Sequence, residues 1–125
     1  MAENSRALPK KHTQAIVDLF ADLGMPRNMA KTLMYISQVD YCRSLDIEKE
    51  THLLQPQVSV AIQELRNRGW VEKQDIKKKG KGRPVHHYRL KKELPDIISS
   101  FEQHKIKEVQ RVTKNFDELK HLLLE

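Results

Sequence analysis

Six residues between positions 55 and 66 carry side chains that suit contact with the edges of nucleic-acid bases. They are Gln55, Gln57, Ser59, Val60, Gln63 and Arg66. Glutamine can bind adenine with two hydrogen bonds, serine can donate or accept one, and valine can touch a thymine methyl group. No nucleophile–base pairing and no glycine-rich phosphate loop accompanies them in the sequence. We therefore expect a binding module rather than an enzyme, with no catalytic residue, no cofactor and no bound metal.

Five of these residues fall on one predicted helix, residues 56–68, and Gln55 immediately precedes it. Val58, Ala61, Ile62 and Leu65 follow the i, i+3, i+4, i+7 pattern of a single buried stripe. Pro56 suits the first position of that helix, and Gly69 suits its end. The six polar or small residues lie outside the stripe, where a helix can enter a DNA major groove. The alternative is an ordinary solvated helix face.

A strongly basic stretch follows this helix. Residues 66–92 hold eleven basic and two acidic residues, a net charge of +9, whereas the whole chain has a formal charge of +6. Residues 70–76 and 85–90 are predicted strands of a hairpin, joined by a glycine-containing turn over residues 77–84. Its cations are Lys77, Lys78, Lys79, Lys81 and Arg83. We expect them to neutralise phosphates, with Arg83 near or in the minor groove; a lysine-rich loop that only aids solubility is the alternative.

The remaining pattern predicts a mainly α fold with a small β-hairpin wing. Amphipathic helices are expected over residues 10–23, 26–39 and 47–51, the last capped by Ser44 or Asp46, and residues 1–9 are expected to be a disordered tail. A winged helix-turn-helix consists of a short helix, a turn, a second helix and a basic hairpin, in this order. The predicted elements follow the same order. We assign residues 10–92 to that domain.

Residues 93–125 are predicted to form one long dimerisation helix, because no proline or glycine follows Pro95. Apolar residues step by three and four, as in a coiled coil, and Lys105 interrupts the repeat. The predicted dimer contacts are Ile98, Phe101, Val109, Val112, Phe116, Leu119 and Leu123. A second copy of the chain is the simplest partner for such a helix.

Composition narrows the class of protein further. The 125 residues, 38% hydrophobic and 32% charged, suit one small domain, and no apolar run approaches the roughly 20 residues of a membrane span. No secretory signal is evident, and the single Cys42 fits a reducing cytoplasm. Cys42 beside Arg43 is either a redox-sensing thiolate or a buried, inert thiol. His86 and His87 are adjacent in a strand and point to opposite faces, so they do not predict a metal site.

Several segments resemble archaeal regulators of the TrmB and MarR types. Residues 23–26 with Ala30 and Tyr35 resemble the opening of TrmB-type regulators, and residues 46–72 resemble their helix-turn-helix. The wing, residues 82–85 with 88–90, is similar to that of archaeal MarR-like and TrmB-like proteins. The resemblance covers residues 16–92 and implies sequence-specific DNA binding by homodimers that control transcription. TrmB-type proteins usually carry a sugar-binding domain after the long helix; the sequence ends at Glu125, so no effector is inferred.

Two other functions fit the same pattern. A chromatin-type protein would use the basic wing without reading bases, and a protein–protein adaptor would dock a partner on the winged helix. The operator, the direction of regulation and any effector, metal or thiol signal stay open at this point.

Overall fold

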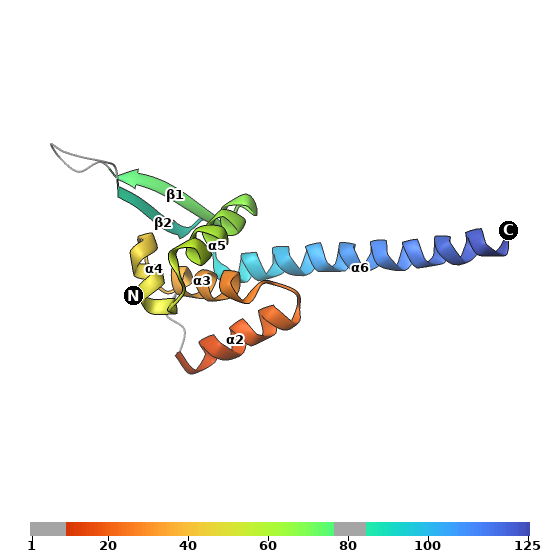
Figure 1. The fold of residues 1–125 in the computed structure, drawn as a ribbon, viewed down its shortest axis with the longest axis horizontal. Helices are drawn as coiled ribbons and strands as arrows, with labels where there is room; N and C mark the ends of the chain where they lie inside the picture. The colour runs from red at the N-terminus through yellow and green to blue at the C-terminus, as the bar shows by residue number, and fades with distance from the viewer. Residues whose placement is uncertain (1–9, 77–84) are drawn as a thin grey trace. The chain divides into compact units, whose positions relative to one another are not determined.

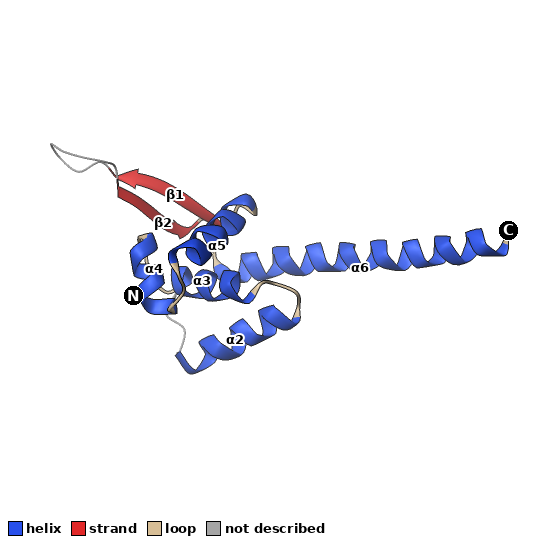
Figure 2. Cartoon of the chain, viewed as in Figure 1, coloured by secondary structure: helices blue, strands red, loops and turns tan. Residues whose placement is uncertain are grey.

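The computed structural model describes residues 10–76 and 85–125, and this part is mainly helical with one small sheet (Figure 1, Figure 2). The elements are α2 (Lys10–Asp22), α3 (Arg27–Ser37), α4 (Ser44–Thr51), α5 (Gln55–Asn67), β1 (Val71–Ile76), β2 (Val85–Leu90) and α6 (Leu94–Leu124). The chain divides into two compact units, residues 1–93 and 94–125. The predicted tail, residues 1–9, and the predicted hairpin tip, residues 77–84, lie outside the described residues.

Helix α3 is the centre of the first unit and packs against α2, α4, α5 and β2. Of its residues, Met29, Ala30, Thr32, Leu33, Met34, Ile36 and Ser37 are buried. The helix is shorter than the predicted 26–39, because Gln38 acts as its C-cap and donates its backbone N–H to carbonyls of the preceding turn.

Helix α4 begins three residues earlier than the predicted 47–51, and neither predicted cap is its N-cap. Arg43 is the N-cap, and the carboxylate of Asp46 accepts its backbone N–H at 2.9 Å. This backbone hydrogen bond is the main reason that the pKa of Asp46 lies below its usual value, and the Arg43 side chain adds to the effect. Asp46 therefore stabilises the helix start from within the first turn, where a negative charge suits the helix dipole.

Helix α5 matches its prediction to within one residue at each end. Val58, Ala61, Ile62 and Leu65 are all buried, which confirms the predicted stripe. The helix starts at Gln55, so Pro56 occupies its second position rather than its first. Gly69 follows with φ +76°, a left-handed conformation that glycine adopts without strain, and ends the helix as expected.

The two strands pair antiparallel, from Val71 opposite Leu90 to Ile76 opposite Val85. Strand β2 has its predicted bounds, whereas β1 starts after Trp70, which is buried at the root of the hairpin. Cys42 and Tyr88 form a bridge that the sequence did not predict, with mutual backbone hydrogen bonds of 2.9 and 2.7 Å. Cys42, two residues before α4, therefore fixes the edge of the hairpin through its backbone.

The second unit is α6, a single helix of 31 residues. Ile97 and Phe101 are buried, whereas Val109, Val112, Phe116, Leu119 and Leu123 are exposed. Phe101 is 3% exposed in the single chain, and Ile97, which the sequence analysis missed, is buried as well. The role of Phe101 as a dimer contact stays a prediction. Lys105 lies over the Phe101 ring and pairs with Glu108 at 3.1 Å. Among the described helices, none is long and apolar enough to cross a membrane.

Candidate nucleic-acid interface

The outward side of α5 is the candidate surface for contact with bases. All six residues singled out there by the sequence are exposed: Gln55, Gln57, Ser59, Val60, Gln63 and Arg66. The buried stripe on the opposite side anchors α5 against α3, α4 and β1. The helix is thus held by one side while its polar side stays open, which is the arrangement that insertion into a major groove requires.

Gln57 also caps the start of α5. Its side-chain oxygen accepts the backbone N–H of Leu54, the N-cap residue, at 2.8 Å. The bond satisfies an amide that the helix itself leaves without a partner. The amide nitrogen of Gln57 keeps both of its donors and the oxygen keeps one lone pair, so a two-point contact with adenine would share that oxygen with the cap.

Gln63 is paired with Asn67, one turn further along α5. The amide nitrogen of Gln63 donates to the side-chain oxygen of Asn67 at 3.0 Å. The pair still offers the Gln63 oxygen as an acceptor and the Asn67 nitrogen as a donor, the combination that the major-groove edge of adenine accepts. Asn67 is therefore a candidate base-contacting residue together with Gln63. The i, i+4 spacing allows the two side chains to meet, and the side-chain geometry shows that they do.

A hollow of about 340 Å³ lies beside the first half of α5. It is bordered on one side by Pro26, Asn28 and Met29 at the start of α3, and on the other by Gln57 and Val60 of α5. Val60 is 63% exposed at this border. Asn28 therefore lies next to the predicted base-reading residues, although nothing in its local sequence marks it for that role.

Two side-chain contacts across the strands hold the stem of the hairpin, one ion pair and one hydrogen bond. The Arg89 guanidinium pairs with Glu72, and the His86 ring pairs with Asp75. The hydrogen bond from His86 is the main cause that holds the pKa of Asp75 below its usual value. Each of the two acidic residues of the basic stretch therefore has a hydrogen-bond partner on the opposite strand. The five predicted phosphate-binding cations, Lys77, Lys78, Lys79, Lys81 and Arg83, lie outside the described residues.

The other candidate chemistries find little support in the described part of the chain. Cys42 is buried, and burial raises the pKa of its thiol to about 12, which favours the buried, inert thiol over the redox-sensing thiolate. His87 stacks on Tyr41, with ring centroids 4.7 Å apart, while His86 faces Asp75. Across residues 10–76 and 85–125, no cluster of three metal-ligating side chains occurs.

No protein-family model matches the sequence, and no curated protein sequence matches it. A possible transcriptional regulator from Methanosarcina mazei Go1 has a similar fold, with a TM-score of 0.63 at 12% identity, over 80% of this chain and 83% of that one. The archaeal chromatin protein TrmBL2, described as showing a novel mode of DNA binding, gives 0.69 at 15% identity, over 90% of this chain but 40% of that one. A MarR family regulator from Neisseria meningitidis gives 0.51 at 16% identity, over 88% and 84%.

These likenesses confirm the predicted fold class. The described chain is a mainly helical winged helix-turn-helix with a two-stranded wing and a long C-terminal helix, the fold of MarR-family and archaeal TrmB-like regulators.

Proposed function

We propose that this chain is a transcriptional regulator that binds double-stranded DNA in a sequence-specific manner as a homodimer. In this proposal residues 10–92 bind DNA and residues 93–125 dimerise. Helix α5 enters the major groove, and the cations of residues 77–84 contact phosphates, with Arg83 at the minor groove.

The observation that carries the proposal is the division of α5 into two sides. Val58, Ile62 and Leu65 are buried, whereas Gln57, Ser59 and Gln63 are exposed. An exposed helix side rich in amides and hydroxyls offers both donors and acceptors to base edges. The net charge of +9 over residues 66–92 supplies the attraction to a polyanion.

The exposed apolar residues of α6 support the homodimer. Val109, Val112, Phe116, Leu119 and Leu123 recur with coiled-coil spacing and are all exposed in the single chain. Such a row is stable in water only when a partner covers it. Two copies joined there would present two α5 helices to half-sites about 34 Å apart or a multiple of that spacing.

Selection of bound sequences from a random DNA pool tests this function directly. We expect a palindromic consensus whose two halves are separated by a whole number of helical turns. A footprint of the selected site should be protected at protein concentrations that leave bulk DNA unprotected, since specific complexes are about 10³-fold or more tighter than non-specific ones. A pool that returns no consensus contradicts sequence-specific binding.

A chromatin-type role is the second candidate, and two observations favour it. The fold resembles that of the chromatin protein TrmBL2 with a TM-score of 0.69, and Gln57 and Gln63 are both held in hydrogen bonds within α5. A protein of this kind would bind through phosphates alone. Competition between the selected site and bulk DNA at one salt concentration separates the two roles, because only the specific binder keeps a large affinity ratio.

A further inference from the structure

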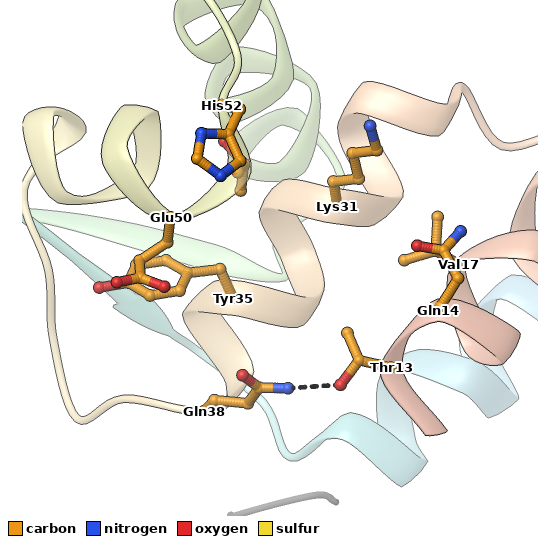
Figure 3. A pocket seen from close by; sticks show the side chains of 9 residues that line it. Thr13, Gln14, Val17, Lys31, Tyr35, Gln38, Glu50 and His52 are labelled. Atoms are coloured by element: carbon orange, nitrogen blue, oxygen red, sulfur yellow. Dashed lines mark hydrogen bonds between the residues drawn. The ribbon is translucent and has the colours of Figure 1, made fainter. Parts of the chain in front are cut away.

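A second hollow, of about 420 Å³, lies in the first unit away from the outward side of α5. Helices α2 and α3 and the end of α4 supply its walls (Figure 3). Its volume falls within the range of small-molecule sites in proteins. Gln38 donates to the Thr13 hydroxyl at 2.9 Å, which ties α2 to α3 at the edge of this pocket.

The pocket is lined by one cation and one anion that have no ion-pair partner among the described residues. Lys31 of α3 and Glu50 of α4 both line it, and neither forms an ion pair with another residue in the part of the chain that the structure describes. Figure 3 shows Lys31 on one side of the pocket and Glu50 on the other, with His52 between them in this view. Two opposite charges on separate walls match a ligand that carries both charges itself.

Tyr35 adds a hydroxyl to the Glu50 side of the pocket. Burial is the main cause that raises the pKa of Tyr35, and the negative charge of Glu50 is one of the smaller contributions. The phenol therefore stays protonated and can donate a hydrogen bond. A simple carboxylate ligand would be repelled by Glu50, and a simple amine would be repelled by Lys31.

The pocket also borders the connection between α4 and α5. His52 lines it with φ +61°, a left-handed conformation that is strained for a residue other than glycine. Its backbone N–H donates to the Glu48 carbonyl at 2.9 Å, and two residues later the chain reaches Leu54, the N-cap of α5. A ligand against His52 therefore touches the turn that sets the start of α5.

We propose that this pocket binds a small zwitterion whose ammonium group faces Glu50 and whose carboxylate faces Lys31, with a short uncharged chain between them. Binding at His52 alters the position of α5 and hence the affinity for DNA. This second consequence rests on the proposed function, whereas binding of the ligand does not.

Titration calorimetry of the full chain with straight-chain ω-amino acids, from glycine to 6-aminohexanoate, tests the site. We expect saturable binding with an optimum chain length, and no binding of hexanoate, hexylamine or glucose. Lys31→Met and Glu50→Gln should each weaken binding about tenfold or more, the value of one hydrogen bond to a charged group. Lys49→Met and Glu48→Gln on α4 are matched controls, since neither side chain lines the pocket.

Several results would overturn the site. They are no saturable binding across the series, binding of the singly charged or neutral molecules as tight as that of the zwitterions, or equal loss in the control variants. Circular dichroism of each variant separates loss of binding from loss of fold. A DNA-shift titration with and without the ligand then tests coupling. Unchanged DNA affinity overturns the coupling and leaves the site, whereas a chain that binds ligand but no DNA contradicts only the proposed function.

Discussion

Phe101 and Phe116 lie about four turns apart on the same helix, yet Phe101 is 3% exposed and Phe116 is 58% exposed. Both are phenylalanines of the apolar pattern of α6, one on each side of the break at Lys105. One is already buried in the single chain, and the other is available to a partner. The sequence pattern alone gave both the same role.

The two phenylalanines should respond differently to truncation. Phe101→Ala should lower the free energy of unfolding by about 3–5 kcal/mol, the usual cost of removing a buried ring. Phe116→Ala should leave the fold of each chain unchanged and weaken dimerisation, because in the proposed homodimer a second copy covers this exposed ring. Urea unfolding and sedimentation equilibrium measure the two effects. Equal sedimentation of Phe116→Ala and the wild type across the dimerisation range would contradict the proposed seam.

Gln57 should show separate contributions to stability and to DNA binding. Gln57→Ala removes the cap on the Leu54 amide and should cost about 0.5–2 kcal/mol of stability, and it should also relax the base preference. Gln57→Glu keeps an acceptor at the helix start, so stability should recover. Its negative charge and lost donors should still impair DNA binding. Thermal unfolding and a DNA-shift assay on the two variants check this, and recovery of both properties in Gln57→Glu would show that Gln57 only caps the helix.

Gln63 and Asn67 should act as one unit in base reading. Gln63→Ala and Asn67→Ala should each relax the preference at the same base pair, by about 1–3 kcal/mol, and the double variant should add little to either single change. Stability should change by less than about 0.5 kcal/mol, since both side chains are exposed. Gln103→Ala on α6 is the matched control. Selection from a random pool with Gln63→Ala that returns the wild-type sequence would show that α5 contacts DNA in a different register.

The wing cations should affect every DNA sequence alike. Lys79→Ala and Arg83→Ala should each weaken binding to the selected site and to bulk DNA by the same factor. The slope of log K against log salt should fall by about one for each lost phosphate contact. Fluorescence anisotropy over a range of salt concentrations measures this slope. A change confined to the selected site would instead place the residue against a base.

Cys42 should be unreactive in the folded protein. Because burial raises the pKa of the thiol to about 12, iodoacetamide at pH 8.5 should label it only as fast as the chain unfolds. The raised pKa also favours the fold while the thiol is neutral. The neutral thiol therefore contributes its full stabilisation below about pH 8.5, the usual pKa of a free cysteine. This stabilisation is lost as the pH rises towards the pKa of Cys42 in the folded protein, and Cys42→Ala should not show this trend. Rapid labelling of the native protein would restore the redox alternative.

The sequence determined the local elements, because apolar spacing, proline and glycine act within a few residues. The buried stripe of α5, the bounds of β2 and the left-handed glycine at position 69 all follow from such short-range signals. Fold class and the outward residues of α5 could therefore be predicted. The start of α4 was misplaced because its cap is a backbone amide held by Asp46, a bond that composition does not reveal.

Tertiary structure decided the relationships between residues far apart in the chain. It paired Cys42 with Tyr88, buried Phe101 and brought Lys31 of α3 and Glu50 of α4 to one pocket. Each of these depends on the packing of whole elements, and periodicity within one helix carries no information about its neighbours. Side-chain hydrogen bonds also decided which donors and acceptors of Gln57 and Gln63 stay available to DNA. The residue type determines what a side chain can bind, but only the structure shows which partners within the protein it already binds.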